Sequence, residues 1–287
     1  MRNLTLILIL CSSLLACTNQ KSLAPLTYEM YPAFESQYIS ARDVKVMLPR
    51  GYNTKKSYPV IYMHDGQMLF DSTTTWNKKE WGVDEVVDSL IKTQKIKSVI
   101  VVGISNNENR YLEYMPNKPM EELKMMERPD KFKGQILSDE YLKFLVEELK
   151  PFIDDNYSTK ADRYNTFILG SSMGGLISCY AISEYPDVFG GAACMSTHWP
   201  ALNGVFLKYV ERNLPDPETH KIYFDYGTKT LDSLYEPYQL QADRMMKERA
   251  YKLDSNWMTK KFEGAIHDED AWRRRLHIPL EFLLGKE

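Results

Sequence analysis

Apolar and polar residues follow two different periods along this chain. Short continuous apolar runs, such as Tyr58–Met63 and Ile96–Ile104, are bounded by polar turns. Between them lie stretches in which apolar residues return every three or four positions, as Val83, Val87 and Leu90 do. Continuous runs are typical of strands buried on both faces of a parallel sheet, and the longer period is typical of amphipathic helices. Their alternation predicts an α/β fold in which helices cover both faces of a mostly parallel central sheet.

The predicted elements fill most of the chain. Strands are expected at residues 43–48, 58–63, 96–104, 164–169, 189–195, 222–226 and 257–262. Helices are expected from 81, from 138, and over 175–184, 235–250 and 271–284, with Ser138 as the N-cap of the second. Residues 105–134 show little periodicity, so we expect a long loop, and such loops are usually functional or disordered. No internal repeat or linker is visible, which predicts one domain over residues 28–287.

The first residues have a different pattern, which indicates export. Arg2 precedes an apolar run over residues 4–10, and Leu14-Leu15-Ala16-Cys17 follows it. This order describes a secretory signal peptide over residues 1–17, and the apolar run is short for a membrane-spanning helix. The ending resembles a bacterial lipobox, which implies cleavage before Cys17 and a diacylglycerol on its thiol. We expect residues 18–27 to form a tether, with a plain secreted protein as the alternative.

Charge and cysteine content narrow the classes of function. The chain has 36 Lys and Arg against 39 Asp and Glu, and no basic stripe, so we expect no nucleic-acid partner. Cys179 falls in a predicted helix and Cys194 in the following strand. We expect both to be buried free thiols, because neither has the setting of a catalytic thiolate. No pattern indicates an oligomeric state.

The candidate chemistry centres on Gly170-Ser171-Ser172-Met173-Gly174, which lies between a predicted strand and a predicted helix. A G-x-S-x-G sequence at such a junction is the nucleophile elbow of the α/β-hydrolase fold. The tight turn strains the backbone and raises one hydroxyl, here that of Ser172, above the carboxyl edge of the sheet. The N–H of Met173 then points at the carbonyl oxygen under attack. A chance match is the alternative, but chance rarely supplies both flanking elements.

Chain order selects a histidine and narrows the choice of acid. In this fold the nucleophile, the acid and the histidine follow one another. Among the 5 histidines, His267 alone follows the last predicted strand in a turn-like segment, so it is the expected general base. Asp225 lies within the strand at 222–226, and Asp232 lies on the loop beyond it. A loop carboxylate can hold an imidazole, which favours Asp232 and leaves Asp225 as the alternative.

Loops at the carboxyl ends of strands supply the rest of the expected site. The loop His64-Asp65-Gly66-Gln67-Met68 should carry the second oxyanion donor, and the N–H of Gln67 is the predicted one beside that of Met173. Ring-bearing side chains on such loops are candidates to line the substrate cleft, although simple packing against the loops is the alternative for each. They are Trp81, Tyr111, Tyr114, His198 and Trp199.

Together these motifs resemble the esterase-D-like esterases, an α/β-hydrolase group that includes enterochelin esterases, feruloyl esterases and family-one acetylxylan esterases. The resemblance covers most of residues 28–285. It rests on the elbow and on Leu48–Tyr52, Tyr62–Gln67, Gly103–Ser105, Arg110–Tyr114, His267–Glu269 and Trp272. It implies a Ser-His-Asp triad, ester hydrolysis without metal or other cofactor, and an acid on the loop after the penultimate strand, which supports Asp232.

We therefore expect a serine esterase that hydrolyses a small-molecule or saccharide ester through an acyl-enzyme, with acylated saccharides and siderophore-type esters as candidate substrates. We expect it to be exported and held at the cell or outer membrane through its lipid anchor alone. An acyltransferase on the same fold and a non-catalytic glycan-binding lipoprotein are the alternatives. A metallohydrolase built on His64-Asp65 and on residues 267–270 is disfavoured, because neither cluster has the spacing of a zinc protease.

Overall fold

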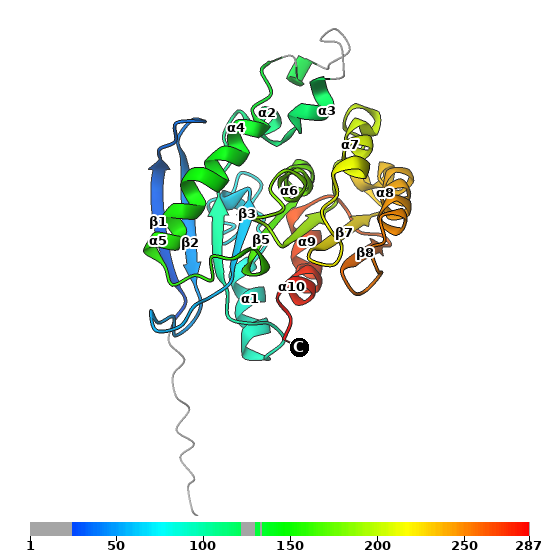
Figure 1. Cartoon of the computed structure of the whole chain (residues 1–287). Coiled ribbons are helices and arrows are strands. Elements are labelled where there is room, and N and C mark those ends of the chain that lie inside the picture. The colour runs from blue at the N-terminus through cyan, green and yellow to red at the C-terminus, as the bar shows by residue number, and fades with distance from the viewer. Residues whose placement is uncertain (1–24, 122–129, 133, 287) are drawn as a thin grey trace, which may run out of the picture.

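The computed structural model describes residues 25–121, 130–132 and 134–286. Its centre is an eight-stranded sheet of order β1-β2-β4-β3-β5-β6-β7-β8. β1 pairs with β2 and β2 with β4 in antiparallel fashion, and all later pairs are parallel. The strands are β1 (Thr27–Phe34), β2 (Arg42–Leu48), β3 (Val60–His64), β4 (Ile100–Ile104), β5 (Thr166–Ser171), β6 (Gly191–Met195), β7 (Lys221–Gly227) and β8 (Trp257–Phe262). The predicted mostly parallel α/β sheet is confirmed (Figure 1).

Helices lie on both faces of this sheet (Figure 1). They include α1 (Val83–Lys92), α2 (Arg110–Tyr114), α3 (Asn117–Glu121), α4 (Ser138–Lys143), α5 (Lys150–Asn156), α6 (Met173–Glu184), α7 (Val205–Asn213), α8 (Glu236–Glu248), α9 (Glu269–Arg275) and α10 (His277–Leu284). Successive residues of a strand point to opposite faces. Along β3, Val60 and Tyr62 therefore belong to the hydrophobic cluster that includes residues of α4, α6, α7 and α8, whereas Ile61 and Met63 belong to the one that includes residues of α1, α9 and α10.

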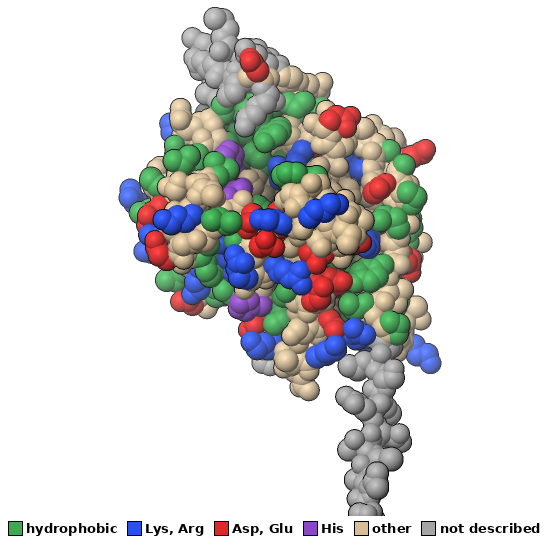
Figure 2. All heavy atoms as spheres, turned by 180° about the vertical axis from the view of Figure 1, so that it is seen from behind, with side chains coloured by type: hydrophobic (Ala, Val, Ile, Leu, Met, Phe, Trp, Pro, Cys, Tyr) green, Lys and Arg blue, Asp and Glu red, His purple; other side chains and the backbone are tan. Residues whose placement is uncertain are grey.

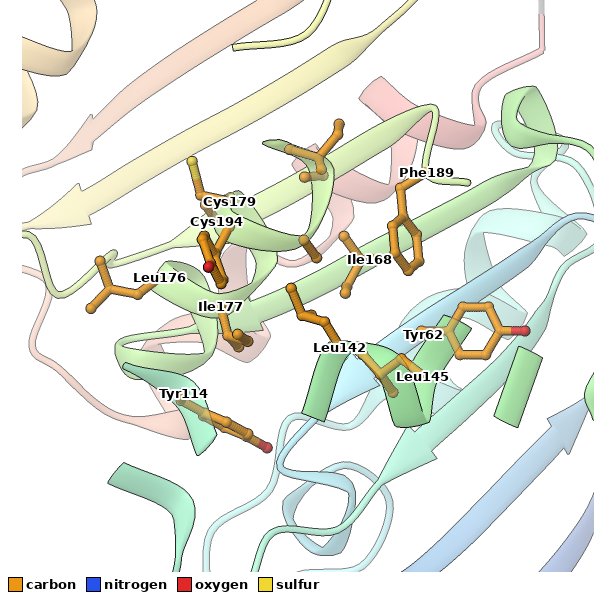
Figure 3. Packing of buried hydrophobic residues seen from close by; sticks show 14 of the residues in the cluster. Tyr62, Tyr114, Leu142, Leu145, Ile168, Leu176, Ile177, Cys179, Phe189 and Cys194 are labelled. Atoms are coloured by element: carbon orange, nitrogen blue, oxygen red, sulfur yellow. The ribbon is translucent and has the colours of Figure 1, made fainter. Parts of the chain in front are cut away.

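The larger hydrophobic cluster holds the elbow helix against the sheet. Figure 3 shows Ile177 of α6 beside Ile168 of β5 and Leu142 of α4. Cys179 and Cys194 lie in the same cluster, and both are buried free thiols, as predicted. Burial of apolar side chains is the main stabilising contribution to such a core. The elbow between β5 and α6 is thus fixed from both sides by packed side chains.

The predicted caps and loops differ from the observed ones in three places. Ser138 is not an N-cap: it begins α4, and its hydroxyl accepts a hydrogen bond from the backbone N–H of Asn117 at 2.9 Å. The predicted closing helix is divided at Leu276 into α9 and α10, because the ring of Pro279 would clash with the carbonyl four residues earlier in a continuous helix. The stretch 105–134 carries α2, α3 and a short 3₁₀ turn among its described residues.

β1 and α7 have no counterpart among the predicted elements. β1 forms one edge of the sheet, and its residues are mostly exposed, so hydrophobic periodicity does not mark it. The expected tether at 18–27 overlaps β1 by its last residue. The expected signal peptide at residues 1–17, with Cys17, and residues 18–24 lie outside the described part of the chain.

Candidate active site

Ser172 lies in a strained turn between the end of β5 and the start of α6. Its φ of 57° and ψ of −121° place a non-glycine residue in a region that L-residues rarely adopt. The turn also requires Gly170, because a Cβ there would lie 2.6 Å from the carbonyl oxygen of Gly174. The backbone N–H of Ser172 donates to the carbonyl of Met195 at 3.0 Å, which ties the turn to β6. The predicted elbow geometry is present.

His267 and Asp232 lie in contact at the same edge of the sheet. The Nδ1 atom of His267 is 2.5 Å from Oδ1 of Asp232, which lies in the 3₁₀ turn η7 (Thr230–Leu234) after β7. The backbone N–H of His267 donates to Oγ1 of Thr230 at 2.9 Å, so the same turn holds both the ring and the chain of the histidine. Asp225 is instead buried within β7 and pairs with Arg275. The structure therefore brings Asp232, and not Asp225, to the histidine.

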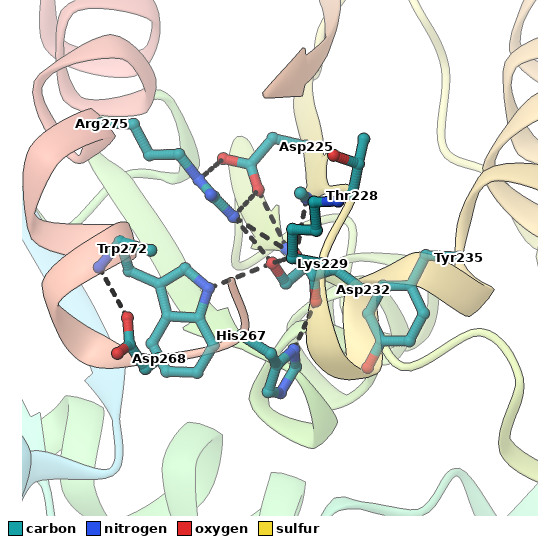
Figure 4. A network of polar contacts seen from close by, with 12 residues as sticks. Asp225, Thr228, Lys229, Asp232, Tyr235, His267, Asp268, Trp272 and Arg275 are labelled. Atoms are coloured by element: carbon teal, nitrogen blue, oxygen red, sulfur yellow. Dashed lines mark hydrogen bonds and ion pairs between the residues drawn. The ribbon is translucent and has the colours of Figure 1, made fainter. Parts of the chain in front are cut away.

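The Asp232 carboxylate is buried but well supplied with hydrogen-bond donors (Figure 4). Its Oδ2 accepts from the backbone N–H of Gly227 at 2.6 Å and from the hydroxyl of Ser196 at 2.7 Å. Burial by itself would raise the pKa of this carboxyl, but His267 and these two donors hold the pKa below its ordinary value. Asp232 is consequently ionised at neutral pH and can stabilise an imidazolium at His267.

The two predicted oxyanion donors belong to the η1 turn and to the start of α6. Gln67 lies in the 3₁₀ turn η1 (Gly66–Met68), and both Gln67 and Ser172 line one cavity. Gly66 lets this turn lie against β4, since a Cβ there would be 2.6 Å from backbone atoms of Gly103 and Ile104. Met173 is the first residue of α6, and the first N–H groups of a helix have no intrahelical partner. Gln67 therefore shares the cavity with Ser172, and Met173 follows Ser172 directly in the chain.

An ion pair supports the η1 turn from the side of α2. Asp65, with a left-handed φ of 58°, accepts two hydrogen bonds from Arg110, both at 2.7 Å. The amide of Asn106 donates to the same carboxylate at 2.5 Å. Burial alone would raise the pKa of Asp65, but Arg110 and Asn106 lower it below its usual range. This bidentate pair fixes the residue that precedes Gly66 and Gln67.

The cavity above Ser172 has a volume of about 660 Å³ and a mixed polar and aromatic lining. Of the predicted cleft residues, Trp81 and Tyr111 line it. Tyr114 and Trp199 do not: both are buried in the larger hydrophobic cluster, and Nε1 of Trp199 donates to Gln239 at 2.8 Å. His198 also lies off the cavity wall, where its Nδ1 is 2.8 Å from the hydroxyl of Tyr235. The prediction was wrong for these three because a loop position does not determine which way a side chain points.

The structure adds residues that sequence reasoning did not single out. Tyr235 is fully buried, its hydroxyl interacts with Ser172, and its ring meets that of His267 edge-on at 5.7 Å. Trp76 lines the cavity and is 83% exposed, so it stands at the mouth. The position of Tyr235 three residues after Asp232 was the available signal for it. Nothing in the local sequence distinguishes Trp76 from any other loop tryptophan.

Comparison with known proteins gives a family and a fold. A family model described as "Putative esterase" matches residues 37–282. The uncharacterized protein YbbA of Bacillus subtilis is 24% identical over 252 residues, which cover 85% of this chain and 93% of that protein. An endo-1,4-beta-xylanase/feruloyl esterase of Xylanibacter ruminicola is 30% identical over 195 residues, which cover 64% of this chain and 22% of that protein. A solved ferulic acid esterase matches with a TM-score of 0.66 and 19% identity over 90% of this chain and 98% of its own.

The family match spans far more than half of the chain, and the structural match covers 90% of it. The elbow, the histidine and the buried acid described above all lie within the matched residues. This chain belongs to the "Putative esterase" family and is a carboxylic ester hydrolase of the α/β-hydrolase fold.

Proposed function

We propose that the enzyme is a serine esterase in which Ser172 attacks the ester carbonyl and His267 is the general base. The contact of 2.5 Å between His267 and Asp232, at the edge of the sheet where Ser172 occupies its strained turn, is the observation that carries this proposal. Asp232 orients the imidazole and stabilises the imidazolium that forms when the serine proton is taken. His267 then protonates the leaving alcohol and activates the water that hydrolyses the acyl-enzyme.

In this mechanism the N–H groups of Gln67 and Met173 bind the oxyanion of each tetrahedral intermediate. Their support is positional: one lies in the η1 turn beside the cavity and the other at the start of α6. Such donors act on the charge that develops in the transition state and not on the ground-state ester.

The shape of the cavity favours an ester with a flat, polar-edged substituent, and we assign acylated saccharides or arylacyl esters as the substrate class. Trp76 and Tyr111 are 83% and 44% exposed at the cavity and offer flat apolar faces. Asn77, Lys79 and Asn106 place polar atoms among them. Aromatic faces flanked by polar groups bind rings of this kind. The names of the feruloyl and ferulic acid esterases to which the chain is similar support the same class.

The test is replacement of the nucleophile. Ser172→Ala should abolish hydrolysis of short-chain nitrophenyl esters and of acetylated or feruloylated oligosaccharides, and should abolish covalent labelling by a fluorophosphonate. Ser183→Ala is the matched control, because it removes a hydroxyl from α6, the helix that follows Ser172, where that hydroxyl donates to the carbonyl of Cys179. Full turnover by Ser172→Ala with a native circular dichroism spectrum would overturn the proposal. Products analysed with a free sugar present would reveal acyl transfer if it occurs.

A further inference from the structure

A buried charged network lies directly behind the Asp232 carboxylate (Figure 4). Arg275 of α9 is 2% exposed and pairs with Asp225 of β7, its Nε and Nη2 lying 3.1 and 3.0 Å from the two carboxylate oxygens. Asp225 also accepts hydrogen bonds from the backbone N–H of Ser196 and from the hydroxyl of Tyr223. The same Nη2 lies 3.9 Å from Oδ2 of Asp232. The guanidinium of Arg275 therefore interacts with the carboxylates of both Asp225 and Asp232.

Ser196 joins this network to the candidate triad. Its hydroxyl oxygen accepts hydrogen bonds from Nη2 of Arg275 at 2.7 Å and from Nε1 of Trp272 at 3.1 Å. A hydroxyl oxygen has two lone pairs and one proton. Since Arg275 and Trp272 can only donate and occupy both lone pairs, the proton of Ser196 has to go to Oδ2 of Asp232, which lies at 2.7 Å. Each hydrogen bond of this hydroxyl has a fixed direction.

The direction of these hydrogen bonds has an electrostatic consequence. Donation from a hydroxyl that is itself polarised by a guanidinium withdraws negative charge from the Asp232 carboxylate. A less negative carboxylate stabilises an imidazolium less well, so the basicity of the histidine bonded to its other oxygen is reduced. A general base must be unprotonated before it can act, so the pH dependence of kcat/KM reports on this chain of hydrogen bonds.

We propose that Ser196 is a positioning residue, which fixes the orientation of Asp232 and, through Asp232, limits the basicity of His267. The inference rests on the proposed function, in which His267 is the general base. Arg275 and Asp225 are the buried support that holds the Ser196 hydroxyl in place. Ser196 and Arg275 were not among the expected site residues. Asp225 was expected only as the alternative acid, and in the structure it supports Arg275 and Ser196 instead.

In the described part of the chain, charged and titratable groups near His267 come from η7, from the residue before α8 and from α9. Asp232 comes from η7, Tyr235 precedes α8, and Arg275 comes from α9. At the start of α9, Asp268 pairs with Lys79, and Glu269 accepts a hydrogen bond from the amide of Asn77. Ser196→Ala changes none of these charges. A change in the titration of His267 in that variant therefore reports on the lost hydroxyl.

The experiment compares the pH dependence of kcat/KM in the wild type, Ser196→Ala and Ser183→Ala, together with the NMR titration of the His267 ring. In Ser196→Ala we expect the acid limb of kcat/KM and the NMR titration curve of the His267 ring to move to higher pH. We also expect kcat on the plateau to fall roughly tenfold, because Asp232 is held less firmly. KM for a nitrophenyl acetate should stay unchanged, and Ser183→Ala should match the wild type.

The outcomes separate this inference from the proposed function. A lower plateau without a shift of the His267 titration would mean that Ser196 is merely structural, and would overturn the inference. Even then, loss of fluorophosphonate labelling in Ser172→Ala would still support the proposed function. Conversely, the His267 titration could move in Ser196→Ala while Ser172→Ala keeps its turnover. That result would support the effect of Ser196 on His267 and would contradict the assignment of Ser172 as the nucleophile.

Discussion

His64, which immediately precedes the η1 turn, is a buried neutral imidazole. It is 2% exposed, its Nδ1 lies 2.8 Å from the hydroxyl of Tyr141, and its Nε2 has no hydrogen-bond partner in the described part of the chain. Burial lowers its pKa to about 3, and the charges of Arg110 and Arg42 add to this, although Asp65 acts in the opposite direction. His64 therefore has a different character from His267, despite lying at the same edge of the sheet.

This neutral imidazole makes the stability of the fold depend on pH. In the unfolded chain a histidine has a pKa of about 6.5, so below that pH the unfolded state binds a proton that the folded state excludes until pH falls to about 3. The contribution of His64 is complete above pH 6.5 and is lost progressively below it. Between pH 7.5 and 5.5 we expect a loss of about 1 kcal/mol in the free energy of unfolding from this group.

Urea unfolding at the two pH values measures this loss, and His64→Asn is the comparison, because Asn retains a polar atom near the position of Nδ1 but does not titrate. The variant should lose less stability than the wild type on acidification, by about that same amount. An equal loss in both proteins would show that His64 is not the responsible group.

At the scale of elements, the η1 turn depends on the absence of a side chain at Gly66. A Cβ there would lie 2.6 Å from backbone atoms of Gly103 and Ile104, and β4 cannot retreat without losing its pairing with β3. Gly66→Ala should therefore displace η1 and the N–H of Gln67. We expect kcat to fall by about 10²-fold, as for the loss of one oxyanion donor, with a smaller effect on KM.

Gly134→Ala is the control for this variant, because a Cβ there first meets the flexible end of the Leu112 side chain at 3.3 Å. Steady-state kinetics and thermal unfolding of both variants give the comparison. If Gly66→Ala kept the wild-type kcat with an intact fold, the η1 turn would not be holding an oxyanion donor.

The elements that could be predicted from sequence are those whose burial produces a regular pattern of apolar residues. The strands β3 and β4 are buried at every position and read as continuous apolar runs, so they were found, whereas the exposed edge strand β1 was missed. His267 was selected by chain order, which the fold imposes, and by its turn-like segment after the last predicted strand. Ser196 and Tyr235 could not be found in this way, since their contacts with Asp232 and Ser172 arise only when β6, β7 and the turn after β7 come together.

At the scale of the whole molecule, the start of the described chain and the candidate site lie at opposite ends of the sheet (Figure 1). Thr27 of β1 pairs with Leu48 of β2, and the neighbouring Met47 pairs with Val101 near the beginning of β4. Thr27 therefore lies at the amino ends of the parallel strands, whereas Ser172 follows the carboxyl end of β5. On the face seen in Figure 2, basic and acidic side chains are interspersed and form no single patch of one sign. Among the described residues, no helix is both long and apolar enough to span a bilayer.

This geometry makes a prediction about the lipid anchor that we propose at Cys17. If the chain is held at a bilayer through Cys17, its cavity should face away from the membrane, because Thr27, where the first strand begins, lies at the opposite end of the sheet from Ser172. Labelled fatty acid should be incorporated into the wild type and not into Cys17→Ser, which should also leave the membrane fraction. Anchored and released enzyme should hydrolyse a soluble acylated oligosaccharide at equal rates. An anchored enzyme that prefers an ester embedded in vesicles, and loses this preference in Cys17→Ser, would instead place the cavity toward the bilayer and contradict the orientation argued from β1.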